Sequence, residues 1–229
     1  AFCGQVGHIG DGVSDAGGMN EVKTGAPIPV PELDHKVPAI PRFKFGEAVL
    51  AEDPLKVNVL WSMTGSPMTQ WPNTTMVKAA LEAIPFVVTV EHYLTSTALY
   101  SDLVLPCTGM FEMEGVLANA RSHWVQLVEK AVDGPGQCKS DLEIFTELAK
   151  RYGFGDAFDV PMDTLISNVI EPTGITLEEL KEKKAIDVVG PDYIPYKDGE
   201  FLTPSKKAEF WVAAWKEEGF DPIVTYARS

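Results

Sequence analysis

The sequence has few cysteines and no closely spaced pair of them. Cys3, Cys107 and Cys138 are the three cysteines among 229 residues, and no C-x-x-C pattern occurs. Zinc and iron–sulfur sites are usually built from such pairs, so we do not expect this chain alone to form one. An odd number of distant cysteines predicts free or buried thiols instead.

Long apolar runs and a surplus of positive charge are also missing. No apolar stretch approaches the roughly 20 residues of a membrane-spanning helix, so we expect no direct membrane insertion. The chain has 33 acidic and 19 basic residues, and its formal net charge is −14. Such a chain repels nucleic acid, which we therefore do not expect as a partner. No export signal is visible, and this leaves the compartment open.

The sequence does contain enough apolar material for a core, because 45% of its residues are hydrophobic and 23% are charged. Residues 1–20 are rich in glycine and predict close-packed turns. Gly10-x-Gly12 lacks the preceding strand and following helix of a dinucleotide-binding fingerprint. Residues 24–54 contain six prolines, which predict an extended surface connection.

Two apolar runs flank an amphipathic segment in the middle of the chain. Residues 57–63 and 86–90 are typical of buried strands. Between them, residues 73–84 place apolar side chains at helical spacing, and Asn73 can cap the first turn. Such a unit predicts parallel strands joined by a right-handed crossover. With a third apolar run at 101–106, the pattern predicts an α/β fold with a Rossmann-like parallel sheet and flanking helices.

Polar side chains follow the first two predicted strands. Ligands of open α/β sheets bind at the carboxyl ends of strands, where glycine allows a close approach and hydroxyls can donate to phosphate. An ionised glutamate there can accept two hydrogen bonds from an N–H pair such as that of guanine. The same residues can equally be turn and cap residues without a ligand. The candidates are Thr64, Gly65, Ser66, Glu91, His92 and Thr95.

The pattern changes after residue 110 and predicts a mixed α+β segment. Residues 114–132 resemble two β segments around a turn. Residues 140–154 predict a helix that begins with a Ser140–Glu143 capping box. Further helices are expected from Thr176 and over 203–219, the latter starting at Thr203 or Ser205. The expected apolar face of the 140–154 helix is Leu142, Phe145, Leu148, Ala149 and Tyr152.

No catalytic nucleophile has an evident base partner. His8 and His123 stand alone, and a lone histidine is more often structural than a ligand. Glu112 and Glu114 are two residues apart, where like charges in an extended chain repel, so Glu114 is interpreted as part of a turn. By its own chemistry the chain therefore resembles half of a binding site.

Several segments together resemble the molybdopterin oxidoreductases of the dimethyl sulfoxide reductase family. They are ALYSDLVLP at 98–106, FEMEG at 111–115 with ANAR at 118–121, and residues 125–153. The glycine-rich opening and FLTPSKKAEFW at 201–211 are similar to further passages of the family, in the same order.

This resemblance implies a part of a large catalytic subunit. Residues 1–110 would be the second half of a molybdopterin guanine dinucleotide-binding α/β domain. Residues 111–229 would be a mixed segment leading toward a C-terminal β-barrel. The residue that ligates the metal, and any iron–sulfur cluster, would lie upstream, so no catalytic or metal-ligating residue is expected here. The part alone is not expected to turn over substrate.

The family's dinucleotide contacts carry over to a few positions. Glu91 matches the acidic residue that contacts the guanosine, Thr95 matches a threonine in the following loop, and Asp141 matches a further dinucleotide contact at a helix start. This sequence departs from the family at Ser66, where asparagine is common, and at Met113, where lysine or histidine is common. The stretch NARSH at 119–123 also differs from the family pattern, which weakens Arg121 as a ligand.

The resemblance implies an enzyme that binds bis(molybdopterin guanine dinucleotide) with molybdenum or tungsten. Its reaction would be two-electron redox chemistry or oxygen-atom transfer, in an anaerobic setting. Its partners would be the rest of the catalytic chain, an iron–sulfur electron-transfer subunit and a membrane anchor, in the periplasm or cytoplasm of a prokaryote. Two alternatives stay open. One is a non-catalytic subunit like the large iron–sulfur subunit of respiratory complex I, and the other is a free-standing nucleotide-binding module.

Overall fold

The computed structural model describes residues 39–118, 124–188, 192, 198–201, 203–217, 219 and 221–223. The glycine-rich opening lies outside the described residues, as do the prolines up to residue 38. Cys3, His8, Arg121 and His123 also lie outside them, so the predictions made for these residues stay predictions.

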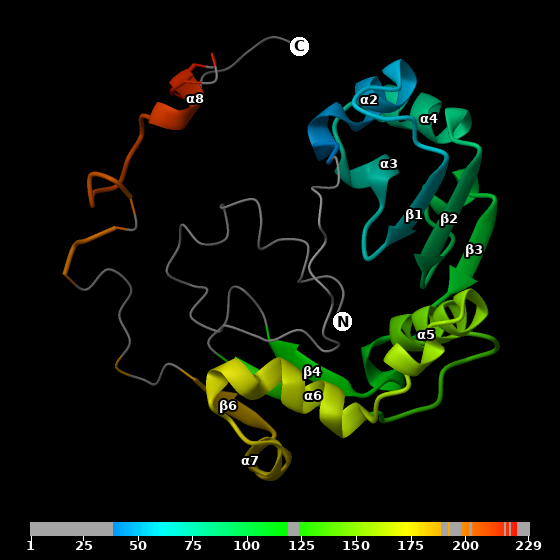
Figure 1. Ribbon diagram of the computed structural model, residues 1–229, viewed down its shortest axis with the longest axis vertical. Helices are drawn as coiled ribbons and strands as arrows, with labels where there is room; N and C mark the ends of the chain where they lie inside the picture. Colours follow the sequence, from blue (N-terminus) through cyan, green and yellow to red (C-terminus); the bar gives the residue numbers. More distant parts are fainter. Residues whose placement is uncertain are drawn as a thin grey trace.

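The first sheet is the parallel sheet that the sequence predicts (Figure 1). Strands β1 (Val59–Met63), β2 (Phe86–Glu91) and β3 (Leu103–Pro106) lie in the order β1-β2-β3, all parallel. Helix α4 (Thr74–Ala83) joins β1 to β2, and the Asn73 side chain caps it by accepting from the Met76 N–H at 3.2 Å. The predicted α/β fold class is therefore confirmed.

Three helices accompany this sheet, and two of them, α2 (Phe45–Ala51) and α3 (Pro67–Gln70), were not predicted. Both join α4 around a common core. The expectation of an extended connection over 24–54 is thus wrong for the α2 segment. The prolines end at Pro41 before the helix, and Phe45 and Val49, four residues apart, are buried together on one face. The common core of this first unit consists of Phe45, Val49, Met68, Val77, Ala80, Leu81, Ile84 and Val87.

A second, smaller sheet follows and is antiparallel. Strands β4 (Gly115–Ala118), β5 (Trp124–Val128) and β6 (Ala185–Asp187) lie in the order β4-β5-β6. The sequence predicts the first two strands but not β6. Helices α6 (Met162–Ile170) and α7 (Leu177–Lys183) complete the unit. Its buried core is separate from the first and consists of Val116, Val125, Ile166, Val169, Ile170 and Leu180.

Helix α5 (Asp141–Tyr152) follows β5 in the chain and begins with the predicted capping box. Ser140 accepts from the Glu143 N–H, and the Glu143 carboxylate accepts from the Ser140 N–H at 2.7 Å. The ring of Phe145 packs 5.5 Å from that of Trp61 in β1, so the helix contacts the first sheet. Tyr152 was wrongly placed on the apolar face: it is 72% exposed and stacks on Phe154, because it lies in the last turn of the helix.

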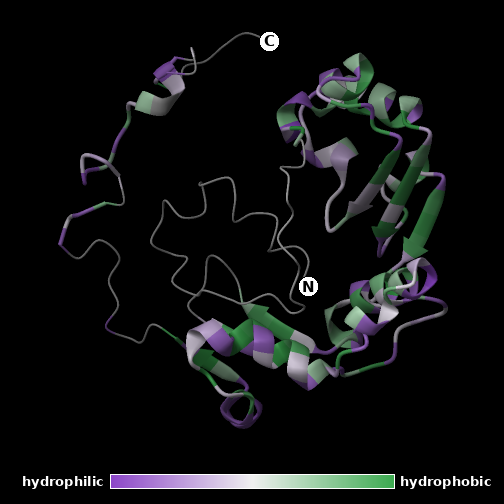
Figure 2. Ribbon diagram, in the orientation of Figure 1, coloured by the Kyte–Doolittle hydropathy of each residue, from purple (hydrophilic) through white to green (hydrophobic). Residues whose placement is uncertain are grey.

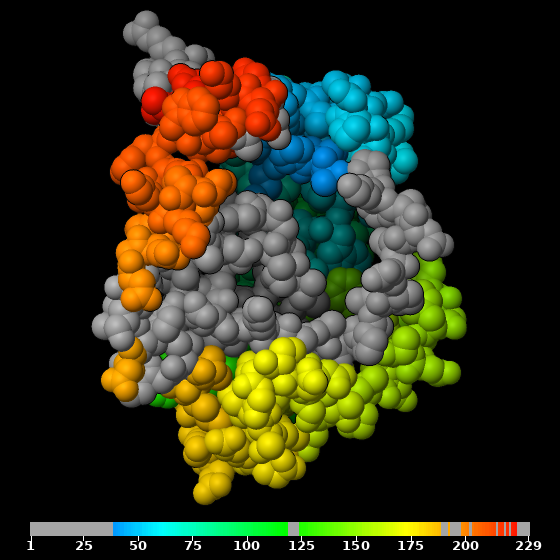
Figure 3. All heavy atoms as spheres, turned by 60° about the vertical axis from the view of Figure 1, so that its left-hand side comes forward, coloured from blue at the N-terminus to red at the C-terminus, as the bar shows by residue number. Residues whose placement is uncertain are grey.

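The predicted helix over 203–219 is much shorter in the structure. Among the described residues of this range only α8 (Ala213–Glu217) is helical, and it belongs to the orange-to-red band that runs up one side of the molecule in Figure 3. The Thr203 hydroxyl donates to the Lys207 carbonyl at 2.7 Å, and Lys206 adopts a left-handed φ of 56°. These local hydrogen bonds hold a turn, and hydroxyl residues often compete with the helix in this way.

Hydropathy follows this arrangement. Figure 2 shows β2, β3 and β4 in green and α7 largely in purple. No helix among the described residues is long and apolar enough to cross a membrane.

Short 3₁₀ turns connect several of these elements. Those of the described residues are η2 (Arg42–Lys44), η3 (Ala98–Tyr100), η4 (Met110–Glu112), η5 (Gly155–Ala157) and η6 (Glu171–Thr173).

Candidate functional site

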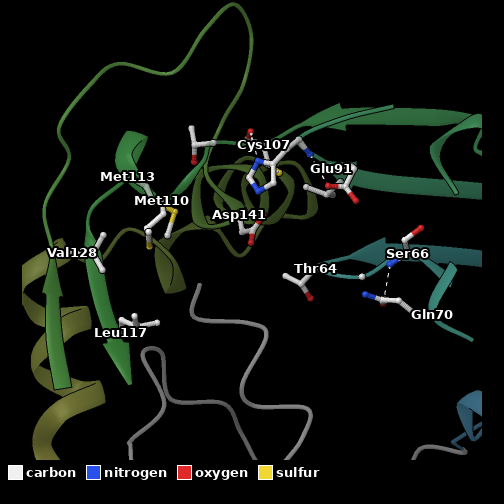
Figure 4. Close-up of a pocket in the computed structure, with 14 residues that line it drawn as sticks. Thr64, Ser66, Gln70, Glu91, Cys107, Met110, Met113, Leu117, Val128 and Asp141 are labelled. Carbon is white, nitrogen blue, oxygen red and sulfur yellow. Dashed lines mark hydrogen bonds between the residues drawn. The ribbon is translucent and has the colours of Figure 1, made fainter. Parts of the chain in front are cut away.

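A pocket of about 440 Å³ opens at the carboxyl ends of β1, β2 and β3 and extends to the β4–β5 hairpin. Figure 4 shows two unlike sides. The polar side comes from the ends of β1 and β2 and from α3, and it carries Thr64, Ser66, Gln70 and Glu91. The apolar side carries Met110, Met113, Leu117 and Val128, and Cys107 and Asp141 lie between the two sides.

The loop after β1 takes an unusual backbone path. Thr64 has a φ of 57°, in the left-handed region that a β-branched residue rarely adopts, and its hydroxyl donates to the Met63 carbonyl at 2.7 Å. A Cβ on Gly65 would lie only 3.0 Å from the Gln70 side-chain oxygen. That same oxygen accepts the Ser66 N–H at 3.1 Å. Strained backbone of this kind is typical of functional loops, and Gly65 fits where a larger residue would crowd Gln70.

The end of β2 places Glu91 and His92 in the pocket. One carboxylate oxygen of Glu91 accepts the His92 N–H at 2.9 Å, which leaves the other oxygen without a hydrogen bond among the described residues. The His92 ring lies beside Cys107, with Nδ1 at 3.3 Å from the Cys107 carbonyl oxygen and 3.5 Å from Sγ. Glu91 is half-buried, so its negative charge acts on its neighbours with less screening than at an open surface.

Cys107 is held as a neutral thiol. Burial, followed by the negative charges of Asp141 and Glu91, raises the pKa of this thiol from its ordinary value of 9.0 to about 11. A cysteine nucleophile needs the opposite, a lowered pKa beside a cationic partner. The His92–Cys107 pair therefore does not form a thiolate nucleophile.

Asp141 enters the pocket from a different part of the chain. It is the first residue of α5, directly after the Ser140 cap, and it lines the same pocket as Glu91, which precedes it by 50 residues. None of the described residues that line the pocket is lysine or arginine. The two carboxylates can accept hydrogen bonds from N–H donors.

The structure brings together six of the seven residues predicted for the site. Thr64, Gly65, Ser66, Glu91, His92 and Asp141 line the pocket. Thr95 does not line it, and its hydroxyl instead accepts the Ala98 N–H at 3.3 Å. The Ser66 hydroxyl is paired at 2.8 Å with that of the fully buried Thr97. The ligand-binding roles of all seven residues remain predictions.

Sequence reasoning missed part of the lining. Gln70 and Thr108 gave no signal, because single polar residues in loops are common. Thr108 stands out in the structure, because its hydroxyl oxygen is buried and has no hydrogen-bond partner among the described residues. Met110 also gave no signal, and Met113 was named only as a departure from the family pattern, although both line the pocket. Within the described part of the chain, no group of three His, Cys, Asp or Glu side chains could hold a metal ion.

Comparisons with known proteins agree with this geometry. The family model of the molybdopterin oxidoreductases matches residues 2–151. The probable oxidoreductase YyaE of Bacillus subtilis is 36% identical over 178 residues, which cover 76% of this chain and 26% of that protein. The F420-dependent formate dehydrogenase subunit alpha of Methanocaldococcus jannaschii is 33% identical over 138 residues, which cover 58% of this chain and 20% of that protein.

A solved structure shows the same fold. Acetylene hydratase from Pelobacter acetylenicus matches with a TM-score of 0.63 and 25% sequence identity, over 81% of this chain and 26% of that one. This chain thus spans about a quarter of the length of the proteins that it matches. The family model covers well over half of the chain, and the sheet and pocket lie mainly within it. The chain belongs to the molybdopterin oxidoreductases, the family of dimethyl sulfoxide reductase.

Proposed function

We propose that this chain holds the guanine end of a molybdopterin guanine dinucleotide in a molybdenum or tungsten oxidoreductase. Residues 1–110 would be the second half of the dinucleotide-binding domain, and residues 111–229 the segment toward a C-terminal β-barrel. When bound, the cofactor would supply two-electron redox or oxygen-atom transfer chemistry. The residues of this chain bind and orient its nucleotide part.

The main observation behind the proposal is that Glu91 and Asp141 line the same pocket. The free oxygen of Glu91 can accept from the N–H pair on the Watson–Crick edge of guanine, and Asp141 adds a second acceptor. A carboxylate accepting from two N–H groups is among the stronger protein hydrogen-bond arrangements.

Other features of the pocket fit a nucleotide as well. The buried Thr108 hydroxyl lacks a partner, so an entering polar group would satisfy it. Gly65 lines the pocket without a side chain, so a ligand can approach its backbone. Met110 and Met113 on the apolar side can pack against a ring face and exclude water. Among the described lining residues there is no lysine or arginine, and this part of the pocket suits the base more than the phosphates.

The wider setting follows from the same proposal. A chain about a quarter the length of its relatives would act together with further parts of a catalytic subunit. The relative from Methanocaldococcus jannaschii is named a subunit alpha, which supports additional subunits, and we propose an iron–sulfur electron-transfer subunit among them. We further propose two dinucleotides per metal, an anaerobic setting, and a place in either the periplasm or the cytoplasm.

The test is cofactor content in the full-length protein that contains this chain. Glu91→Gln and Asp141→Asn keep the side-chain shapes but remove the charged acceptors. Each should lower retained cofactor by about tenfold, because a hydrogen bond to a charged group contributes roughly 1.5–3 kcal/mol. The measurements are metal content by mass spectrometry and GMP released by acid hydrolysis after dialysis.

Glu47→Gln is the matched control, since this exposed carboxylate lies on α2 away from the pocket. It should retain the wild-type cofactor content. Unchanged GMP and metal in both pocket variants would rule out the proposed role. Metal-free, pterin-free wild-type protein would instead favour the non-catalytic alternative.

A further inference from the structure

The side chain of Thr97 joins two loops that are distant in the sequence. Thr97 is fully buried, with 0% of its surface exposed. Its hydroxyl oxygen accepts the Met68 N–H at 3.1 Å and is paired with the Ser66 hydroxyl at 2.8 Å. These partners are 29 and 31 residues away along the chain. One hydroxyl therefore connects the loop after β1 with the loop after β2.

The hydrogen bond to Met68 replaces a missing helix cap. The first N–H groups of a helix have no partner within it and are usually capped by the side chain just before the helix. Ser66 stands at that position before α3, yet its side chain makes no capping hydrogen bond. Thr97 supplies the acceptor from outside, and the Ser66 hydroxyl turns to Thr97 instead.

Thr97 is itself held in place. The Ser101 hydroxyl and the Tyr100 N–H both donate to the Thr97 carbonyl, each at 3.0 Å. Its side chain thus extends from a fixed backbone rather than from a free loop. Because Met68 is also buried, the hydrogen bond between them is shielded from water.

The two connected loops form the polar side of the pocket. Residues 64–66 line it from the end of β1, and Glu91 and His92 line it at the start of the segment that leads to Thr97. Thr97 does not line the pocket. Any effect it has on a ligand must therefore act through the position of these loops.

We infer that Thr97 is a positioning residue that sets the distance between the loop at 64–66 and Glu91, and so the width of the nucleotide site. The inference rests on the proposed function. Loss of the hydroxyl leaves the Met68 N–H buried without an acceptor, and the loop at 64–66 shifts toward water to satisfy it. The pocket then widens and holds the nucleotide less well.

The experiment measures how long the cofactor stays bound to the full-length holoprotein, as GMP released by acid hydrolysis after increasing times of dialysis. Thr97→Val keeps the shape but removes the hydroxyl, and it should shorten the half-time of cofactor loss by about tenfold. Thr97→Ser keeps the hydroxyl and should stay within about twofold of the wild type. Thr97→Ala and Thr97→Ser form a second pair, which differ only in the hydroxyl, for use if the valine variant does not fold.

Thr173→Val is the control for loss of a partly buried hydroxyl. The Thr173 hydroxyl donates to the Ile170 carbonyl at 2.6 Å and accepts the Ile175 N–H at 3.3 Å, and Thr173 does not line the pocket. This variant should lower the melting temperature without shortening cofactor retention. Equal retention in Thr97→Val and Thr97→Ser, or equal loss in Thr173→Val and Thr97→Val, would overturn the inference.

Glu91→Gln in the same series separates the two proposals. If it shortens retention while Thr97→Val does not, only the role of Thr97 is wrong. If neither variant shortens cofactor retention, or if the wild-type holoprotein releases no GMP, the proposed guanine site is wrong. The proposed role of Thr97 is then wrong as well.

Discussion

The two sheets contribute different chemistry to the same pocket. The parallel sheet presents strand ends with hydroxyls and a carboxylate, whereas the antiparallel β4–β5 hairpin presents Leu117 and Val128. Their interiors differ too. Ser62, Thr89 and Thr97 are the buried polar residues of the described chain, and all three belong to the first unit. The second core is wholly apolar among the described residues.

This difference suggests that the two units have different roles in the site. Buried hydroxyls need partners in specific directions, so they specify the path of a loop more tightly than apolar contacts do. Apolar side chains stabilise through burial and shape with little directionality. The first unit therefore fixes the polar loops of the site, and the second supplies a wall against which a ligand can pack.

The largest expected effects come from removing one large side chain from each core. Leu81→Ala in the first unit and Leu180→Ala in the second should each lower the free energy of unfolding by about 2–5 kcal/mol, because both leucines are buried and each leaves a cavity. Hydrogen exchange should show lost protection mainly in the mutated unit, since the two cores are separate. Leu99→Ala, at a residue that is 72% exposed, is the control. Equal loss of protection in both units would show that they form one cooperative core.

A smaller effect is expected from two helix caps. Ser140→Ala before α5 and Thr176→Ala before α7 each remove a side chain that accepts an N–H, at a cost of about 1 kcal/mol in thermal or denaturant unfolding. The Ser140 variant should also shorten cofactor retention, because the next residue, Asp141, lines the pocket. The Thr176 variant should not, because α7 contributes no pocket residue. Equal retention in the two variants would show that Asp141 is positioned without its cap.

The last prediction concerns the reactivity of the Cys107 thiol and involves no change in the fold. With the pKa raised from 9.0 to about 11, the thiolate fraction at pH 8 is about a hundredfold below that of an ordinary thiol. Alkylation of the Cys107 peptide, followed by mass spectrometry, should be correspondingly slow and should rise until the pH passes about 11.

The charges of the polar side contribute to that shift. Glu91→Gln removes one of them, so the pKa of Cys107 should fall and alkylation at pH 8 should become faster. If wild-type Cys107 were alkylated at pH 8 at the same rate as glutathione, the raised pKa of its thiol would be contradicted.

Much of the fold could be predicted because its signals are local. The β-α-β unit, the Asn73 cap and the Ser140–Glu143 capping box depend on residues within a few positions of one another. Helix α2 was missed because nearby prolines obscured a short apolar pair. The helix over 203–219 was overpredicted because its pattern could not show that Thr203 and Lys206 form a turn.

The candidate site was predicted at the strand ends and at the start of α5, but its apolar side was not predicted. The positions after β1 and β2 followed from the rule that ligands bind at strand ends. Asp141 entered only through the family resemblance, since a carboxylate in the first turn of a helix is favourable without any ligand. Thr108 and Gln70 carried no signal at all.

The sequence by itself determined the parallel β-α-β unit, the caps at Asn73 and Ser140, and the family, because these signals lie within single segments. Only the tertiary structure decided that Glu91 meets Asp141, that Thr95 stays out of the pocket, and that Thr97 caps a helix 29 residues before it. Such contacts depend on how whole sheets and helices pack, and packing depends on the combined shapes of residues far apart in the chain.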